Sequence, residues 1–213
     1  MIRNVVIFLL VLLSAPVSLI RADESAQELL EKVRRKYNAI TDAQLKFSQR
    51  VTFGVSKIEQ KTSGTLFLKK ENKYRLELNG QTIVTDGKTV WSYSASNNQV
   101  LIDNFKVDER SITPERILAG APGDFSAFIV SHEKLGKTDV VVLKLVPGDE
   151  GSVIKSLKLA VDESTWFIKK VELVDVNGKE TEYLINELHV NTGLLNSRFT
   201  YEIPQGVEVV DLR

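Results

Sequence analysis

The Gly87-Lys88-Thr89 triplet is the stretch whose residue types most suggest ligand chemistry. In a P-loop these residues follow a glycine-rich turn, where backbone N–H groups and the lysine hold nucleotide phosphates. That motif requires glycine at the position of Thr82, and the nearest upstream glycine, Gly80, has the wrong spacing. A P-loop also leads into a helix, whereas the triplet leads into TVWSY, a strand-like run. We therefore interpret the triplet as a turn between two strands.

Other residues capable of catalysis are few and scattered along the chain. The two histidines, His132 and His189, lie far apart, and His189 stands between apolar residues of a predicted strand. No serine occupies a Gly-x-Ser-x-Gly hydrolase motif, and no zinc-protease or calcium-loop motif is present. Glu172, Asp175 and Asp211 occur as isolated carboxylates, and the sequence leaves open whether a folded sheet brings carboxylates together in pairs. We therefore expect a protein that is not an enzyme and that needs neither cofactor nor metal.

The elements that must position any binding site begin with one amphipathic helix over residues 25–40. Ser25 and Glu28 have the spacing of a capping box, in which each side chain satisfies the other residue's free backbone donor. Apolar residues then follow at helical spacing, namely Leu29, Leu30, Val33, Tyr37 and Ile40.

After this helix the apolar period changes to two and predicts about eleven short strands, the last over residues 197–203. Turn pairs separate several of them, and Asn79-Gly80, Asp86-Gly87 and Asn177-Gly178 are strong hairpin signals. The pattern pauses between about 105 and 135. There we predict a short helix starting at Pro114 and a second one capped by Asp124.

The predicted fold is therefore mainly β, of the α+β type. A large antiparallel sheet must curl to cover its apolar face, and the helices can lie over its mouth. Apolar side chains on consecutive hairpin strands are candidates for the lining of such a container: Leu66, Leu68, Tyr74, Leu76, Leu78, Trp91 and Tyr93. They fit either an ordinary core or a cavity for a lipid-like ligand, and composition leaves both open.

Residues 1–22 have the layout of a secretory signal peptide, with Arg3, an apolar run over 5–13 and a predicted cleavage after Ala22. Residues 23–213 are expected to form one domain. The whole chain has 28 basic and 28 acidic residues, and removal of Arg3 and Arg21 leaves 26 against 28. This balance gives no reason to expect nucleic acid as a partner. Because cysteine is absent, we expect no disulfides and no acylated cysteine.

Four stretches of the sequence resemble the LolA family of periplasmic outer-membrane lipoprotein carriers. They are FSQRV at 47–51, GTLFLKKENKYRLEL at 64–78, IVTDGKTVWSY at 83–93 and FTYEIPQGVEVVD at 199–211. Their order and separations match the family along essentially the whole predicted mature chain.

The resemblance implies an unclosed β-barrel of about eleven strands with a helical lid over a hydrophobic cavity. The cavity would shield the acyl chains of triacylated or diacylated lipoproteins. An inner-membrane Lol ABC transporter would load the carrier, and an outer-membrane acceptor, LolB where present, would receive the cargo. The resemblance further implies a monomer in the periplasm.

The resemblance also suggests residues that control the lid. By position, Ile117, Leu118, Phe125 and Phe128 fall in the lid region. Where the family often has Lys-Arg-Pro, this chain has Lys69-Lys70-Glu71. The family arginine is thought to hold the lid closed, so Lys70 is the latch candidate, and Arg75 is a second candidate. Lysine lacks the planar fork of arginine, which predicts a weaker or different latch.

Other functions remain open at this level. The chain could carry another lipid, such as a glycolipid or a pigment, or it could be a periplasmic regulator that senses lipid or lipoprotein. A hydrolase that uses the cavity as an acyl pocket is disfavoured by the missing nucleophile motif.

Overall fold

The structure is a computed structural model that describes residues 25–54, 57–106, 125–148 and 151–213. Its elements are α1 (Ala26–Asn38), β1 (Asp42–Phe53), β2 (Ile58–Lys69), β3 (Lys73–Leu78), β4 (Gln81–Asp86), β5 (Thr89–Ser94), β6 (Gln99–Asn104), β7 (Phe125–Leu135), β8 (Thr138–Pro147), β9 (Ile154–Asp162), β10 (Ile168–Asp175), β11 (Glu180–Val190), the short 3-10 helix η1 (Asn196–Phe199) and β12 (Glu208–Asp211).

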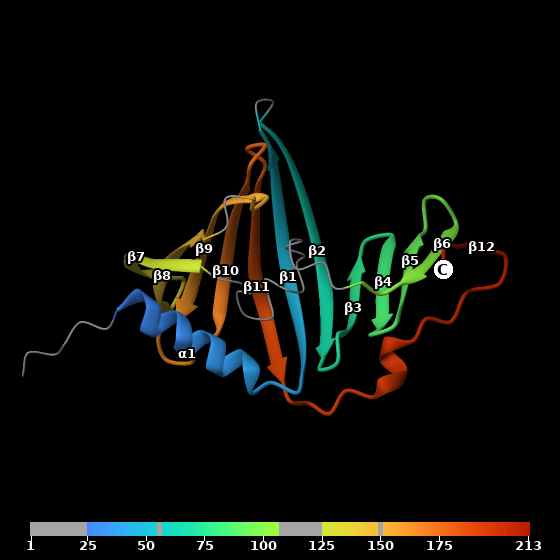
Figure 1. The fold of residues 1–213 in the computed structure, drawn as a ribbon, viewed down its shortest axis with the longest axis horizontal. Coiled ribbons are helices and arrows are strands. Elements are labelled where there is room, and N and C mark those ends of the chain that lie inside the picture. The colour runs from blue at the N-terminus through green and yellow to red at the C-terminus, as the bar shows by residue number, and fades with distance from the viewer. Residues whose placement is uncertain (1–24, 55–56, 107–124, 149–150) are drawn as a thin grey trace, which may run out of the picture.

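The twelve strands form one sheet in the order β12-β6-β5-β4-β3-β2-β1-β11-β10-β9-β8-β7. Neighbours along the sheet pair antiparallel, except that β12 runs parallel to β6. Strands β7 and β12 form the two edges, so the described sheet is curved but not closed into a barrel (Figure 1). The long strands β1, β2 and β11 stand at its middle, with α1 across the β7–β11 half.

Helix α1 begins where the sequence predicts it. The Ser25 N–H donates to a Glu28 carboxylate oxygen at 2.8 Å, and the Glu28 N–H donates to the Ser25 hydroxyl oxygen at 3.3 Å, which confirms the capping box. Leu29, Leu30 and Val33 are buried on one side of the helix. Their spacing therefore lays α1 on the sheet as the amphipathic pattern predicts.

The Gly87-Lys88-Thr89 triplet lies in the hairpin between β4 and β5, which confirms the turn interpretation. The Asp86 carboxylate accepts hydrogen bonds from the Lys88 and Thr89 N–H groups, both at 2.8 Å. Gly87 has φ +93°, and a side chain there would collide with the carbonyl oxygen of Glu71. Glycine is therefore required by the tight turn rather than by a phosphate.

Two of the sequence predictions for this fold are wrong. Residues 125–135 form strand β7 instead of a helix capped at residue 124, because Phe125, Ala127 and Ile129 turn the same side of a strand toward the sheet's core. The last predicted strand, over 197–203, is instead η1 followed by extended chain, with Phe199 fully buried. The final strand is β12, beside β6. The short helix predicted from Pro114 lies outside the described residues.

Candidate functional site: the apolar inner face of the sheet

The two faces of the sheet differ in what packs on them. We call the face that packs on α1 the inner face and the opposite one the outer face. Directly paired residues share a face, and the registers place Leu45, Leu66, Leu76 and Ile83 side by side across β1 to β4. The first three belong to the buried cluster that includes the apolar side of α1, and Ile83 packs against it. This row therefore marks the inner face.

Five of the predicted lining residues lie on this inner face. Leu66 is fully buried and Leu76 is 5% exposed, so both are part of the core. Leu68, Tyr74 and Leu78 are only half-buried and pack against the same cluster. Their remaining surface lies on the inside of the curved sheet, the side that the sequence pattern assigns to an apolar ligand.

Trp91 and Tyr93 lie on the other side of the sheet, so the expectation that all seven residues share one lining face is wrong. Trp91 pairs directly with Val84, which in turn pairs with Arg75 and not with the inner-face row. The Tyr93 ring stacks on the ring of Tyr201, with centroids 6.0 Å apart. Both aromatic residues therefore belong to the outer face.

The C-terminal segment covers this part of the outer face. It runs from the end of β11 past β3 to β5 and ends at β12 (Figure 1). The Arg198 guanidinium lies 4.4 Å from the centroid of the Phe67 ring, and η1 contacts β3 and β4. Phe67, Val84 and Phe199 are thereby buried on this side. The segment gives the sheet a second, smaller apolar layer, which the strand pattern alone did not reveal.

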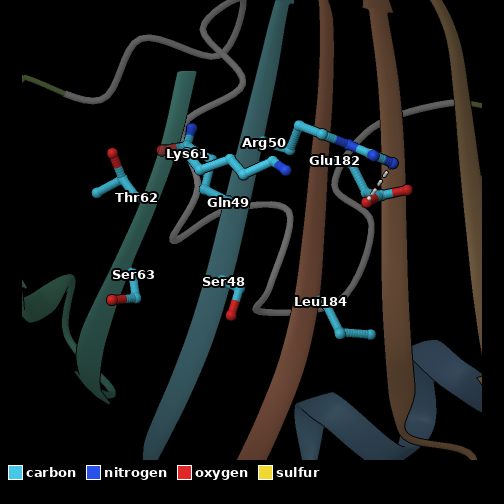
Figure 2. A pocket seen from close by; sticks show the side chains of 8 residues that line it. All are labelled: Ser48, Gln49, Arg50, Lys61, Thr62, Ser63, Glu182 and Leu184. Atoms are coloured by element: carbon cyan, nitrogen blue, oxygen red, sulfur yellow. Dashed lines mark hydrogen bonds and ion pairs between the residues drawn. The ribbon is translucent and has the colours of Figure 1, made fainter. Parts of the chain in front are cut away.

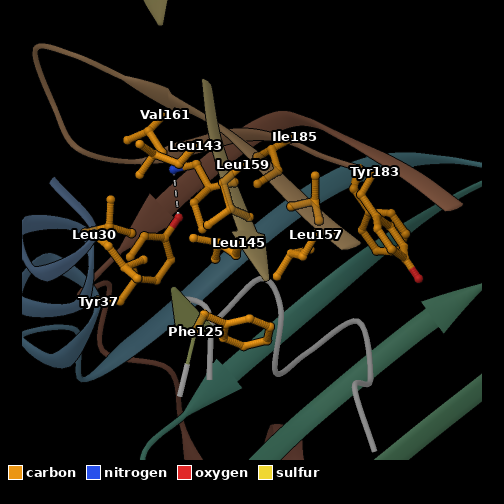
Figure 3. Packing of buried hydrophobic residues seen from close by; sticks show 14 of the residues in the cluster. Leu30, Tyr37, Phe125, Leu143, Leu145, Leu157, Leu159, Val161, Tyr183 and Ile185 are labelled. Carbon is orange, nitrogen blue, oxygen red and sulfur yellow. Dashed lines mark hydrogen bonds between the residues drawn. The ribbon is translucent and has the colours of Figure 1, made fainter. Parts of the chain in front are cut away.

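Helix α1 fills the inner face over strands β7 to β11. Leu30 and Tyr37 of the helix lie against Leu143 and Val161 (Figure 3). The Tyr37 hydroxyl accepts a hydrogen bond from the Ile168 N–H at 3.0 Å, and burial raises the pKa of that hydroxyl above its usual value. The buried side of α1 and its hydrogen-bonded tyrosine cover the sheet here, so this half of the face is core. The half-buried residues Leu68, Tyr74 and Leu78 lie on the other half of the face, on β2 and β3.

The predicted lid residues are only partly within the described chain. Ile117 and Leu118 lie outside the described residues. Phe125 is 9% exposed and belongs to the inner cluster, whereas Phe128 is 54% exposed and pairs with Lys144 of β8. Phe125 and Phe128 therefore stand on a strand and differ in burial, and only Phe125 contributes to the inner cluster.

The two latch candidates occupy different surfaces. Lys70 is exposed in the turn between β2 and β3, and its backbone N–H donates to the Thr41 carbonyl oxygen at 3.1 Å. Arg75 pairs with Phe67 and so lies on the outer face, where its Nε donates to the Glu77 carboxylate at 2.6 Å. Arg75 therefore points away from the inner face, and Lys70 stays the latch prediction.

The outer face of the central strands is charged. An ion-pair chain runs across it, from Arg50 to Glu182 at 2.9 Å, from Glu182 to Lys170 at 2.7 Å, and from Lys170 to Glu172 at 2.6 Å. The hydrogen bond and charge of Lys170 hold the pKa of Glu172 below its usual value. For Lys170, burial acts to lower the pKa, but the two carboxylates outweigh it and raise the pKa.

A hollow of about 430 Å³ lies on this charged face (Figure 2). Ser48, Arg50, Lys61 and Glu182 line it from the outer face, and Gln49 and Thr62, which alternate with them along β1 and β2, also border it. The Arg50 side chain is 44% exposed and that of Lys61 is 73% exposed. Its walls are polar and open to solvent, so it does not suit an acyl chain.

The candidate catalytic residues are not assembled into a site. His132 pairs with Glu163 at 2.8 Å on the surface, and His189 is exposed. No group of three or more possible metal ligands is present within the described ranges. In those ranges there is also no helix long and apolar enough to span a membrane.

Comparison with known proteins gives a family and several relatives. Residues 38–202 match the family described as outer membrane lipoprotein carrier protein LolA. An outer-membrane lipoprotein carrier protein of Pseudomonas paraeruginosa is 28% identical and covers 91% of both chains. One from Azotobacter vinelandii is 27% identical, over 96% of this chain and 98% of its own.

A solved structure shares the fold. It is a conserved protein of uncharacterised function from Thermus thermophilus, with a TM-score of 0.59 and 16% identity, over 88% of this chain and 99% of its own.

Proposed function

Since the chain belongs to the LolA family of outer membrane lipoprotein carrier proteins, we propose that it carries lipoproteins through the periplasm with their acyl chains held against the inner face of its sheet. The observation that carries the proposal is the half-buried apolar surface of Leu68, Tyr74 and Leu78 beside a complete core. This surface would be covered by a ligand rather than by the described protein.

The physical need for such a carrier is large. Burial of a methylene group is worth about 0.8 kcal/mol, so a sixteen-carbon acyl chain exposed to water costs about 11 kcal/mol. A lipoprotein with two or three such chains cannot cross an aqueous compartment unaided. An apolar face that binds the chains without covalent chemistry would shield them, and no catalytic group is required.

The relatives' names and the predicted signal peptide support the route. We propose that an inner-membrane Lol ABC transporter loads the protein, that it acts as a monomer in the periplasm, and that it delivers its cargo to the outer membrane, where LolB is the acceptor if present. In this scheme the energy of ATP is used by the transporter. The carrier contributes an open sheet from which cargo can leave.

A release assay tests the proposal. Spheroplasts of a Gram-negative bacterium that lacks its own carrier would be pulsed with labelled palmitate and incubated with the purified mature protein. We expect labelled lipoprotein in the soluble fraction as a one-to-one complex. Lipoprotein that stays in the membrane would refute the proposal. If a different lipid co-purified with the protein, that lipid would be assigned as the cargo instead.

A further inference from the structure

A row of polar residues crosses the inner face directly beside its apolar part. The registers place Gln49 of β1 opposite Thr62 of β2 and opposite Tyr183 of β11. Two positions before Gln49 on β1 is Phe47, which is 1% exposed and belongs to the inner cluster. Because side chains alternate along a strand, Phe47 and Gln49 share the inner face. The inner face thus carries a polar row between the apolar positions Phe47 and Val51 of β1.

The row is a built feature rather than a loose surface contact. The Gln49 side-chain N–H donates to the Tyr183 hydroxyl oxygen at 3.0 Å. The Tyr183 ring packs edge-on against Phe47, with centroids 5.8 Å apart, and the residue is 5% exposed. Tyr183 lies at the side of the cluster away from α1, and its hydroxyl points out of the cluster (Figure 3). The tyrosine therefore fixes the amide of Gln49 at the border of the apolar region.

Gln49 has further hydrogen-bonding capacity. A glutamine amide offers two N–H donors and a carbonyl oxygen. Within the described part of the chain its one hydrogen bond is the donation to Tyr183, which leaves a second N–H and the carbonyl oxygen for another molecule. Gln49 and Thr62 are both half-buried. Partly buried polar groups on an apolar face usually fix the orientation of a ligand.

From this geometry we infer that Gln49, positioned by Tyr183, binds together with Thr62 the ester and amide carbonyl groups at the head of the acyl chains. The inference rests on the proposed function. Each acyl chain ends in a carbonyl, an acceptor for the free amide N–H and the threonine hydroxyl. The amide N–H groups of an acylated cysteine are donors for the Gln49 carbonyl oxygen. The acceptor carbonyls and the donor N–H groups at the head of the ligand therefore both have hydrogen-bonding partners in this row.

The inference also assigns a direction to the cargo. On the apolar side of the row lie Phe47 and then Leu45 and Leu66, toward the end of the sheet at which α1 joins β1. On the other side, the inner positions of β2 are Gln60 and Ile58, both exposed near the β1–β2 turn. The acyl tails therefore run from the row past Leu78 toward the half-buried Leu68 and Tyr74, and the acylated cysteine lies toward the β1–β2 turn, where the attached protein can leave.

The test compares two synthetic lipopeptides that differ at the carbonyls. One carries a cysteine with two palmitoyl ester chains on its glyceryl group, and the other carries two hexadecyl ether chains. Affinities of both are measured for wild type, Gln49→Leu and Tyr183→Phe. A single hydrogen bond supports a change of about threefold to tenfold in the ester-to-ether affinity ratio. We expect the ester-to-ether affinity ratio to fall about threefold to tenfold in Gln49→Leu, which removes the amide. The ratio should fall less in Tyr183→Phe, which keeps the Gln49 amide but no longer holds it in place.

Gln44→Leu is the matched control, because Gln44 stands on the same strand but on the outer face, opposite Phe67. It should keep the wild-type ratio. If Gln49→Leu unfolds, Gln49→Met, which keeps the length of the side chain without its amide, takes its place in the comparison. A ratio that is the same in wild type and in these variants overturns the inference and leaves the carrier function intact. Failure of wild type to bind either lipopeptide overturns both.

Discussion

The substitution Leu68→Glu tests whether the inner face binds acyl chains. Leu68 is half-buried on this face, between Ala43 and Tyr74 in the strand pairing. In the empty protein its exposed part allows a carboxylate to reach water. A bound acyl chain would remove that water, and burial of an unpaired carboxylate is costly. The variant should therefore fold but bind acyl chains poorly.

The expected magnitude follows from what Leu68 contributes. Full burial of a leucine side chain is worth about 1.5–3 kcal/mol, but most of Leu68 is already covered in the empty protein. The ligand covers the remainder, worth about 0.5–1 kcal/mol, so its loss weakens binding about twofold to fivefold. The desolvation of the new charge adds to this. Leu68→Gln introduces no charge and should lose less acyl affinity than Leu68→Glu. The comparison separates the effect of the lost apolar contact from the effect of the buried charge.

Leu184→Glu is the matched control. Leu184 is 38% exposed and pairs with Ser48 on the outer face, in the charged hollow. A substitution at such a surface site changes stability by at most about 0.5 kcal/mol, so acyl affinity should stay within about twofold.

The assay is fluorescence anisotropy of a dipalmitoyl lipopeptide labelled on its peptide, with thermal unfolding of each variant to confirm the fold. If Leu184→Glu weakens binding as much as Leu68→Glu, the assignment of the two faces is wrong. If neither variant weakens binding, the inner face is not the acyl site.

Three further predictions concern the frame around this face. Trp91→Glu should lower the denaturation midpoint, because the residue is half-buried on the outer face, yet leave the acyl affinity of the folded protein unchanged in the anisotropy assay. Gly87→Ala should cost about 1–3 kcal/mol in urea unfolding, because φ is +93° and the Glu71 carbonyl blocks a side chain; an unchanged midpoint would contradict the turn geometry. Burial acts to raise the pKa of Asp42, but hydrogen bonds from Thr192 and its neighbours outweigh it and lower the pKa. The stability from Asp42 is therefore present above the ordinary aspartate pKa of about 4 and is lost as the pH falls through the lower folded pKa. Asp42→Asn should have a lower free energy of unfolding than wild type in urea at pH 7. The difference in free energy between the two proteins should become smaller below pH 4, and a difference that grows on acidification would contradict this.

The helix and most of the strands could be predicted because their signals are local. The Ser25–Glu28 capping box and the Asp86-Gly87 turn each depend on a few neighbouring residues, and the structure confirms both. Alternation in a strand likewise identifies two faces. It does not say which face turns inward, so the strand pattern alone assigns Trp91 and Tyr93 to the inner set although they lie on the outer face.

The remaining misses depend on contacts between distant segments. Phe125 and Phe128 have a spacing that fits a helix, but pairing with β8 makes the segment a strand. Phe199 is buried because η1 folds back on β3 and β4. The polar row was also missed, because Gln49 and Tyr183 are 134 residues apart in the chain and meet only when β1 pairs with β11.

The central claim is that acyl chains lie on the inner face. The most direct measurement is site-specific photo-crosslinking to a lipoprotein with labelled palmitate. A benzophenone side chain would replace Leu68 on the inner face or Leu184 on the outer face. We expect labelled adducts from position 68 and none above background from position 184. Adducts from position 184 with none from position 68 would contradict the claim.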